Sequence, residues 1–353
     1  MSDTDGPELT PVRPTHRFDE AALGKYLARN MDEAGGTLEV LQFEGGQSNP
    51  TFLLRCDGRE FVLRKQPPGE LLPSAHQVDR EYRVMAALAG TGVPVPRMYL
   101  LCEDVSVIGT KFYVMEHVPG RVFTDPLMSA APPAERRAVY EHLADVLAAL
   151  HSVDYREVGL ESFGRPGNYY ARQISRWSKQ YVASKTEEIE TMDRLMRWLP
   201  ENIPDTDETV VVHGDYRLGN TIVDRSAPRI LAVLDWELST LGHPLADLGY
   251  VCQTYHAEPD DLHGLNRPNL EELEVPTEAE FIARYCERAG RERIENWTFY
   301  LVYNMFRSAA IIQGVYRRGL DGNASSDTAL GFEGYCRARA DIAWRLVEGE
   351  GRG

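Results

Sequence analysis

The sequence predicts an α+β fold of two lobes, a β-rich amino-terminal lobe followed by a mainly helical carboxy-terminal lobe. The chain has 353 residues, 43% of them hydrophobic, which is enough for two modest domains or one large bilobal one. Apolar runs separated by turn signals fill residues 38–118, whereas apolar residues at helical spacing dominate from about residue 133. We therefore predict a mobile lead over 1–18, an amino-terminal lobe over 19–117 and a carboxy-terminal lobe over 118–353.

In the amino-terminal lobe, an amphipathic helix is expected near residues 19–31, followed by strands. The Asp57-Gly58 pair lies between two apolar runs and is a strong hairpin signal. Apolar residues at helical spacing predict one helix, over 76–90, that ends at Gly90. The result is a five-stranded antiparallel sheet with this helix inserted after the third strand. The strands are expected at 38–44, 51–56, 60–65, 98–102 and 111–118.

The carboxy-terminal lobe is predicted to be helical apart from one β-rich interval. That interval covers residues 209–224 and 229–237 and should form a hairpin-like insert that carries polar residues. We expect the ligand in the cleft between the lobes, because pockets favour such junctions. The helices are expected at 135–153, 168–182, 187–199, 278–289, 292–318 and 328–347.

Composition excludes several classes of protein. The net charge is −16, and no run of Lys and Arg offers the basic face that a nucleic-acid binder needs. No stretch reaches the roughly 18–20 apolar residues of a membrane span, and the amino terminus does not resemble a secretory signal. The five cysteines are scattered and lack CxxC spacing, which argues against a disulfide framework or a structural zinc site. We expect a cytoplasmic protein with reduced thiols.

The densest polar cluster runs from His213 to Asn220, between two apolar segments. A second apolar run, 230–234, leads directly to Asp235. Polar groups presented at the ends of buried segments are costly unless they are paired or functional. Two carboxylates and an amide suit a hard cation with oxygen ligands, Mg²⁺ above all.

The spacing within this cluster points to phosphoryl transfer. His-x-Asp-x-x-x-x-Asn is the catalytic-loop spacing of protein kinases, and His213, Asp215 and Asn220 match it. In that chemistry Asp215 orients the attacking hydroxyl, while Asn220 and Asp235 hold Mg²⁺. Arg217 lies two residues past Asp215 and is expected to meet a phosphate oxygen.

Other readings of these residues are weaker. Asp and Asn are common in turns, but three positions at kinase spacing after apolar runs make an ordinary turn a poor explanation. A zinc site is disfavoured because HExxH is absent, and a serine hydrolase because GxSxG is absent.

HGDYRLGN followed by LDWE resembles the aminoglycoside phosphotransferase and choline kinase superfamily, which has the protein-kinase-like bilobal fold. EFVLRKQPPGE, REYRVMAAL, VPVPRMYLLCED and FYVMEHVPG are similar to its branch associated with acyl-CoA dehydrogenases. The resemblance covers roughly residues 25–320. No dehydrogenase activity is expected, because no GxGxxG opens a βαβ unit.

The resemblance implies roles for individual residues. Asp215 is the catalytic base, and Asn220 with Asp235 binds Mg²⁺. His213 braces the catalytic loop, and Asp247 supports the metal-binding region. The residues that would contact ATP are Ser48 and Asn49 in the turn over the phosphates, Arg64 with Glu81, and Met115, Glu116 and Val118 at the hinge beside adenine.

The lysine that kinases carry on the third strand falls at Arg64 in this chain, with Lys65 next to it. Successive strand residues point to opposite faces, so only one of the two reaches the phosphates. We expect Arg64 paired with Glu81, with Lys65 as the alternative. Arginine suits this role, since it binds phosphate oxygens bidentately.

Aromatic side chains follow helical spacing in the helices expected over 168–199 and 292–318, which is more typical of core than of a pocket. The resemblance nevertheless implies that such helices supply the acceptor site, and we expect their outer parts to form its wall. Arg172, Arg176 and Lys179 would suit a coenzyme A acceptor.

The sequence thus predicts an ATP- and Mg²⁺-dependent phosphotransferase that acts on a hydroxyl of a small molecule. The acceptor is a hydroxyacyl-CoA or hydroxy acid, or an aminoglycoside-like compound. A catalytically silent nucleotide-binding scaffold is the alternative, which the intact Asp215, Asn220 and Asp235 argue against. A protein kinase is disfavoured, because no APE segment follows Asp235.

Overall fold

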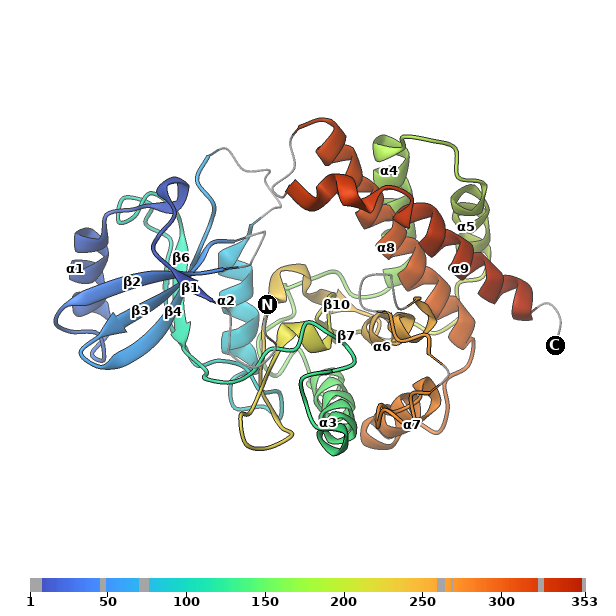
Figure 1. Cartoon of the computed structure of the whole chain (residues 1–353), viewed down its shortest axis with the longest axis horizontal. Coiled ribbons are helices and arrows are strands. Elements are labelled where there is room, and N and C mark those ends of the chain that lie inside the picture. Colours follow the sequence, from blue (N-terminus) through green and yellow to red (C-terminus); the bar gives the residue numbers. More distant parts are fainter. Residues whose placement is uncertain are drawn as a thin grey trace.

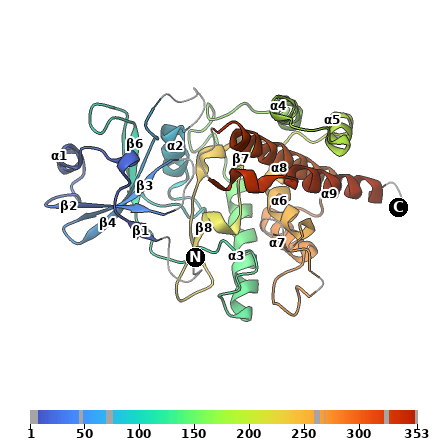
Figure 2. The same cartoon turned by 45° about the horizontal axis from the view of Figure 1, so that its top comes forward.

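The structure is a computed structural model of the chain and contains two lobes side by side (Figures 1 and 2). The amino-terminal lobe is a twisted sheet flanked by two helices, and the carboxy-terminal lobe is a group of helices around a few short strands. The residues that the structure describes are 8–44, 49–69, 76–258, 264–267, 269–322 and 327–350.

The sheet of the amino-terminal lobe has six strands among the described residues, in the order β1-β2-β3-β4-β6-β5, with all neighbours antiparallel. The prediction of five strands missed β1, which pairs with β2 through Leu9↔Phe43. This strand comes from the segment that was predicted as a mobile lead. Asp57 and Gly58 both have positive φ (46° and 76°), as a tight hairpin between β3 and β4 requires. The strands are β1 (Leu9–Thr10), β2 (Leu38–Phe43), β3 (Thr51–Cys56), β4 (Arg59–Lys65), β5 (Met98–Cys102) and β6 (Phe112–Glu116).

Helices cover the two faces of this sheet (Figure 1). On one face α1 (Glu20–Asn30), capped by Asp19, packs Leu23 and Leu27 into a small core with the sheet. On the other face lies α2 (Val78–Leu88), whose buried stripe continues into the large core of the carboxy-terminal lobe. The second face of the sheet is therefore the one that meets the other lobe.

The carboxy-terminal lobe is organised around its longest helix, α8, which packs against α4, α6 and α9. The α7 helix begins with a capping box between Thr277 and Glu280. The α-helices are α3 (Pro133–His151), α4 (Tyr169–Ser184), α5 (Glu190–Glu201), α6 (Leu245–Cys252), α7 (Glu278–Ala289), α8 (Trp297–Leu320) and α9 (Tyr335–Glu350). Short 3₁₀ segments are η1 (Pro14–His16), η2 (Leu218–Asn220), η3 (Trp236–Leu238), η4 (Gln253–His256) and η5 (Asp327–Phe332).

The β-rich interval of this lobe forms two strand pairs where one hairpin-like insert was predicted. β8 (Thr221–Val223) pairs with β9 (Ile230–Val233), as expected of a hairpin. β7 (Val210–Val212) pairs instead with β10 (Thr240–Gly242), which follows the predicted interval. The two pairs hold the polar segments 213–220 and 234–239 between them.

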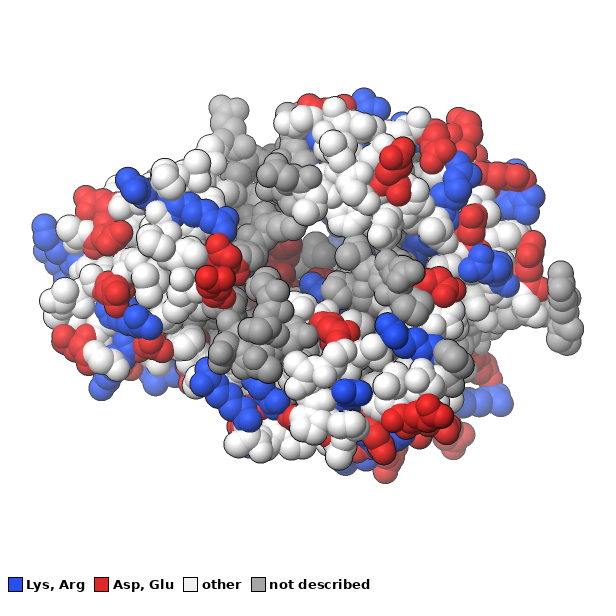
Figure 3. Space-filling model, in the orientation of Figure 1, with Lys and Arg blue, Asp and Glu red and all other residues white. Residues whose placement is uncertain are grey.

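Most aromatic residues of α4 and α8 are buried in the core. Tyr170 packs edge-on against Phe299 and Tyr303, with ring centroids 5.1 and 4.9 Å apart, and Tyr303 is fully buried. Within the described residues, no helix is both long and apolar enough to cross a membrane. On the face shown in Figure 3, charges of both signs are dispersed, and a hollow lies between the lobes.

Candidate active site

The predicted catalytic loop, which begins at His213, follows β7, and Asp247 of α6 fixes its first two residues. The Asp247 carboxylate accepts hydrogen bonds from the backbone N–H groups of His213 (2.6 Å) and Gly214 (2.8 Å). The His213 side chain is fully buried, and its Nε2 lies 2.9 Å from the carbonyl oxygen of Leu234. His213 therefore links the catalytic loop to the segment that carries Asp235.

The pKa of Asp247 is lowered although its side chain is buried. Burial alone would raise the pKa of its carboxyl group, but the His151 hydrogen bond, the nearby His213 and the Gly214 N–H together lower that pKa below its usual value. His151 Nε2 lies 3.4 Å from Asp247, and its Nδ1 lies 2.8 Å from the Tyr285 hydroxyl. A lowered pKa favours the ionised carboxylate, which can accept both hydrogen bonds from the loop. The loop is therefore held in place by residues of the fold itself.

Gly214 is required by the shape of this loop. Its φ is +83°, and a Cβ atom there would lie 2.6 Å from the carbonyl oxygen of Leu238. We expect Gly214→Ala to lower the free energy of unfolding by more than the roughly 1–3 kcal/mol of backbone strain alone. Urea denaturation of Gly58→Ala is the matched control, because Gly58 has φ +76° with open space around it. Equal losses in the two variants would contradict the steric argument.

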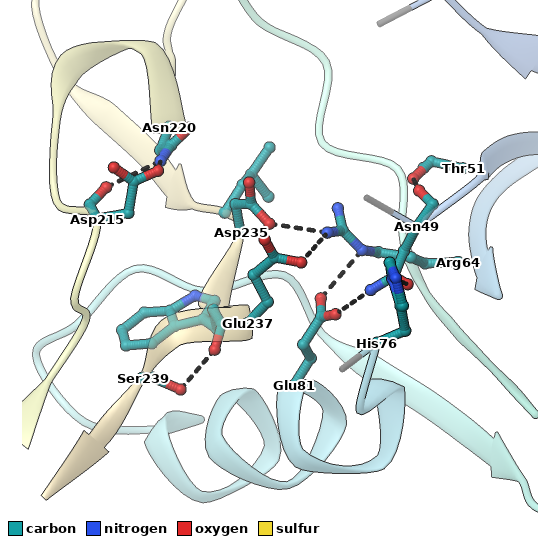
Figure 4. A network of polar contacts seen from close by, with 12 residues as sticks. Asn49, Thr51, Arg64, His76, Glu81, Asp215, Asn220, Asp235, Glu237 and Ser239 are labelled. Carbon is teal, nitrogen blue, oxygen red and sulfur yellow. Dashed lines mark hydrogen bonds and ion pairs between the residues drawn. The ribbon is translucent and has the colours of Figure 1, made fainter. Parts of the chain in front are cut away.

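Asp215 lies at the centre of the loop and is held by Asn220. The Asn220 Nδ2 donates to Asp215 Oδ2 (2.7 Å) and to the Asp215 carbonyl oxygen (2.8 Å), as Figure 4 shows. The Arg217 Nε lies 3.7 Å from the same carboxylate. The Asp215 side chain is 20% exposed, so it is fixed in position and still accessible to a substrate.

Asp235 is placed beside Asn220 by the β8–β9 pair. The Leu234 N–H donates to the Asn220 carbonyl oxygen at 2.8 Å, which ties the two segments together just before Asp235. Asp235 has a positive φ of 64°, a conformation that Asp tolerates better than most residues. Asn220 and Asp235 both line the cleft between the lobes, where their side-chain oxygens can serve as ligands.

Arg64 of β4 is the centre of a buried ionic cluster between the lobes (Figure 4). Its Nε lies 3.0 Å from Glu81 of α2, and its Nη2 lies 2.7 Å from Asp235 and 3.9 Å from Glu237. The side chain of Arg64 is 13% exposed and that of Glu81 only 1%. Burial alone would lower the pKa of Arg64, but Glu81 and the other nearby carboxylates raise it. The same burial raises the pKa of Glu81 to about 7, against the lowering effect of Arg64.

Lys65, the alternative to Arg64, lies on the opposite face of the sheet. It is buried beside Phe18, whose ring centroid is 5.9 Å from its Nζ, and burial lowers the pKa of Lys65. Only Arg64 of the two lines the cleft. The strand alternation read from the sequence is thus the alternation found in the structure.

Of the two turn residues predicted to contact the ATP phosphates, Ser48 and Asn49, only Asn49 can be compared with the structure. Ser48 lies outside the described residues, as do the other residues of 45–48. Asn49 is fully buried, its Nδ2 donates to Glu81 at 2.7 Å, and its Oδ1 lies 3.0 Å from His76 Nδ1. The structure therefore places the Asn49 side chain behind the cleft, where it orients Glu81, and its amide group is engaged there.

The cleft between the lobes encloses a cavity of about 470 Å³. Its lining includes the predicted hinge residues Met115, Glu116 and Val118, together with Arg64, Asn220 and Asp235. A cavity of this size is within the range of small-molecule and cofactor sites. The predicted nucleotide-contact and metal residues thus meet around one cavity, apart from Ser48, Asn49 and Glu81.

Arg307 of α8 and Tyr250 of α6 are functional candidates that the sequence reasoning did not assign. Arg307 is buried and donates to the Gly214 carbonyl oxygen at 2.6 Å, with its guanidinium 5.3 Å from the centre of the Tyr250 ring and 5.6 Å from Trp177. Burial raises the pKa of Tyr250, and the neighbouring Asp215 raises it further. Their contacts depend on helix packing, which no local motif reveals.

The fold and this constellation define a kinase-like phosphotransferase, and the comparisons agree. The chain belongs to the phosphotransferase enzyme family, whose sequence model matches residues 39–300.

Curated relatives cover nearly all of this chain but are much longer. The chain is 45% identical to mouse acyl-CoA dehydrogenase family member 10 over 98% of its length, and 46% identical to chicken acyl-CoA dehydrogenase family member 11 over 92%. It spans 33% and 43% of those proteins, respectively. An aminoglycoside 3'-phosphotransferase of Streptomyces ribosidificus is 27% identical over 66% of this chain and 82% of its own.

Solved structures support the fold. A Ralstonia eutropha protein named as a candidate aminoglycoside phosphotransferase is 47% identical, with a TM-score of 0.87 over 94% of this chain and 99% of its own. A choline kinase of Cryptosporidium parvum has a TM-score of 0.65 at 12% identity, over 94% of this chain and 96% of its own. An aminoglycoside phosphotransferase in complex with AMP-PNP and hygromycin B has a TM-score of 0.61 at 19% identity, over 92% of this chain and 98% of its own. The last two show likeness of fold alone.

Proposed function

We propose that the chain is an ATP- and Mg²⁺-dependent kinase that transfers the γ-phosphoryl group to a hydroxyl of a small molecule. The observation that carries the proposal is the convergence of Asn220, Asp235 and Arg64 on one cleft, with Asp215 hydrogen-bonded to Asn220. Phosphoryl transfer needs this set, because catalysis consists mainly of positioning and of neutralising charge.

The cleft offers groups that suit the adenine ring of ATP and others that suit its phosphates. The hinge strand ends at Glu116, so the backbone from Glu116 to Val118 borders the cleft and can hydrogen-bond an adenine edge. Arg64 also lines the cleft and has a positive charge fixed by Glu81, which suits phosphate oxygens.

The oxygen donors fit Mg²⁺ bound together with a nucleotide. Asn220 uses its Nδ2 on Asp215, which leaves its Oδ1 for a cation, and Asp235 uses Oδ1 on Arg64, which leaves Oδ2. Among the described residues there is no group of three or more His, Cys, Asp or Glu side chains that could hold a metal by itself. Mg²⁺ is commonly held by one or two protein ligands plus substrate phosphates and water, and there it neutralises charge on the phosphates. Asn220 and Asp235 would be those ligands.

Asp215 would act on the acceptor. Its carboxylate, held by Asn220, accepts the proton of the hydroxyl as the hydroxyl oxygen bonds to the γ-phosphorus and the bond from phosphorus to the leaving oxygen of ADP breaks. Arg217, 3.7 Å from Asp215, supplies positive charge beside the transferred group. The products are ADP and a phosphate monoester.

The relatives suggest two kinds of acceptor. The long curated relatives are named as acyl-CoA dehydrogenases, which favours a hydroxyacyl-CoA or hydroxy acid for this chain. The relatives named as aminoglycoside phosphotransferases favour an aminoglycoside-like compound. Arg172, Arg176 and Lys179, which the sequence suggested for a coenzyme A acceptor, are not among the described residues that line the cleft.

A mass-spectrometric screen with Mg·ATP tests the proposal. The panel contains aminoglycosides, choline-like amines, hydroxy acids and hydroxyacyl-CoA thioesters. A product heavier by about 80 daltons, the mass of one transferred phosphoryl group, should form with the wild-type chain. ATP binding without any product across the panel would favour the silent scaffold.

We expect Asp235→Asn to raise the Mg²⁺ concentration needed for half-maximal activity by at least tenfold. The substitution removes charge from a ligand oxygen that Mg²⁺ prefers, while the amide can still hold part of the Arg64 contact. The measurement is initial rate against Mg²⁺ at fixed ATP. Asp321→Asn on the surface near α8 is the control, and an unchanged Mg²⁺ requirement in Asp235→Asn would remove Asp235 from the metal site.

A further inference from the structure

Arg307 of α8 is a buried cation to which the proposed phosphoryl transfer has so far given no role. It is only 6% exposed, and it does not line the cleft between the lobes. Within the part of the chain that the structure describes, Arg307 forms no direct ion pair with a carboxylate. A buried charge without such a partner is costly, so a guanidinium that served only the fold would be expected to have one. A role in function would explain why the charge is present.

The Arg307 guanidinium is held by two aromatic rings and by one backbone carbonyl group. Its central carbon lies 5.3 Å from the centre of the Tyr250 ring and 5.6 Å from that of Trp177, within the range of cation–π contacts. Its Nη2 donates a hydrogen bond to the carbonyl oxygen of Gly214 at 2.6 Å. Burial alone would lower the pKa of Arg307, but nearby tyrosine side chains and the Asp215 carboxylate raise it. The positive charge thus lies against the peptide unit that leads into Asp215.

The Gly214–Asp215 peptide unit is held at both of its polar ends. Its carbonyl group accepts the hydrogen bond from Arg307, and its N–H group, which belongs to Asp215, donates to His213 Nδ1 at 3.1 Å. In the preceding peptide unit, the Gly214 N–H group donates to Asp247 of α6 at 2.8 Å. Side chains of α6 and α8 therefore hold the two peptide units that flank the Cα atom of Gly214.

This support matters because glycine has an unusually free backbone. Glycine adopts positive and negative φ with similar ease, and Gly214 has a φ of +83°. Without a donor on its carbonyl oxygen, the Gly214–Asp215 peptide unit could rotate at a lower cost. Such a rotation changes the backbone at Asp215 and moves its carboxylate away from Asn220, whose Nδ2 donates to it at 2.7 Å. The hydrogen bond from Arg307 opposes that rotation.

The close packing of α6 against α8 places Arg307 where it reaches this carbonyl group. A Cβ atom on Gly249 of α6 would lie 2.6 Å from Asn304 Nδ2 and 2.9 Å from the Tyr300 carbonyl oxygen, both in α8. The absence of a side chain at Gly249 thus lets the two helices meet about one turn before Arg307 along α8. Arg307 therefore projects from a rigid pair of helices, which fix a side chain more precisely than a loop does.

We propose that Arg307 is a positioning residue that locks the Gly214–Asp215 peptide unit and thereby sets the direction of the Asp215 carboxylate. The inference rests on the proposed kinase function, in which Asp215 accepts the proton of the hydroxyl. Arg307 acts through Asp215 and makes no contact with ATP, since it does not line the cleft. A misplacement of about 1 Å at a reacting group can lower a rate about 10²-fold, so loss of this lock should be visible in turnover.

The variant Arg307→Met tests the lock, because it removes the charge and the donor and keeps an unbranched, apolar side chain. Turnover is measured with Mg·ATP and the compound of the panel above that the wild-type chain phosphorylates fastest. We expect kcat to fall by about ten- to a hundredfold, while KM for ATP stays within about twofold of the wild type. The midpoint of urea unfolding should stay near the wild-type value, because removal of a buried cation without a carboxylate partner offsets the lost hydrogen bond.

Two further variants make the result specific. Arg307→Lys keeps a charge and a donor, so its kcat should be at least about fivefold above that of Arg307→Met. Arg318→Met, at an exposed position of the same helix, is the matched control and should change none of these values. Should Arg307→Met fail to fold, Arg307→Lys carries the test. An ammonium group lacks the planar fork of a guanidinium, so the kcat of Arg307→Lys should be at least about threefold below the wild type.

Hydrogen–deuterium exchange measures the lock without any turnover. Amide exchange in residues 213–220 should be at least about tenfold faster in Arg307→Met than in the wild type, because the loop opens more often once its carbonyl contact is lost. Arg318→Met should exchange at the wild-type rate in this segment.

The outcomes separate this inference from the kinase function. An unchanged kcat in Arg307→Met, with or without a lower urea midpoint, would overturn the inference while the kinase function stands. A kcat in Arg307→Lys no higher than in Arg307→Met would also overturn it. If the wild-type chain phosphorylates no compound of the panel, faster loop exchange confined to Arg307→Met would support the lock although the kinase function fails. Unchanged exchange in that case would overturn both.

Discussion

Asp215→Asn should lower kcat by about 10²–10⁴-fold or more, the contribution expected of a general base. The substitution removes the proton acceptor but keeps an oxygen that can accept the hydrogen bond from Asn220 Nδ2, which is 2.7 Å long in the wild-type chain. The loop should therefore keep its shape, and ATP should bind with nearly unchanged affinity. Single-turnover phosphorylation and calorimetric titration of ATP measure the two quantities separately.

Two comparisons make this result interpretable. Asp321→Asn, an exposed carboxylate paired with Arg317, should leave both kcat and ATP affinity unchanged. Asp215→Asn that retains turnover within a few-fold of the wild type would contradict the assignment of Asp215 as the base. A loss of ATP binding together with turnover would indicate instead that Asp215 mainly shapes the cleft.

Arg64→Met should lower the free energy of unfolding by about 3–5 kcal/mol, because it leaves Glu81 buried without its cation. Arg64 also pairs with Asp235, so the variant should bind ATP weakly as well. Arg59→Met, on the exposed part of the same strand, is the matched control for stability. The double variant Arg64→Met/Glu81→Gln should recover part of the stability but none of the ATP affinity. Full stability in Arg64→Met would mean that the pair contributes little to the fold.

The same variant should show a distinct dependence on pH. Burial already raises the pKa of Glu81 to about 7 from its usual 4.5, and the loss of the Arg64 charge would raise it further. Between pH 4.5 and that raised pKa, the folded variant then holds a proton that the unfolded chain has released. The free energy of unfolding of Arg64→Met should therefore fall as pH rises through this window. Urea denaturation at pH 5.5 and 8 measures the difference.

The order of elements was predictable because it follows from local periodicity, whereas the pairing of Arg64 with Glu81 was implied by the resemblance. Alternation along β4 places Arg64 and Lys65 on opposite faces whatever the rest of the chain does. The spacing from Asp215 to Asn220 similarly predicted the catalytic loop, and Asp235 was expected after the next strand. These are features in which neighbouring residues determine the outcome.

Other features depend on contacts that the sequence does not display. The two-residue strand Leu9–Thr10 is too short for a periodic signal and exists only because β2 offers an edge. The turn residue Asn49 was placed over the phosphates, whereas packing against α2 turns its amide toward Glu81. Arg307 carries no motif in the sequence, and only the packing of α8 beside the catalytic loop brings it to the Gly214 carbonyl oxygen.

The position of the catalytic loop also bears on the kinetic mechanism. Gly219 is the only residue, within the described lining, that lines both the cleft and a second cavity of about 190 Å³, so the segment after Asp215 separates two hollows and, under the proposed kinase function, nucleotide and acceptor would bind side by side. Neither would have to depart before the other arrives, and both could be present while Asp215, as proposed, accepts the proton. Such an arrangement favours a ternary complex of enzyme, nucleotide and acceptor. The phosphoryl group would then pass directly between the two ligands, and no phosphorylated enzyme would form.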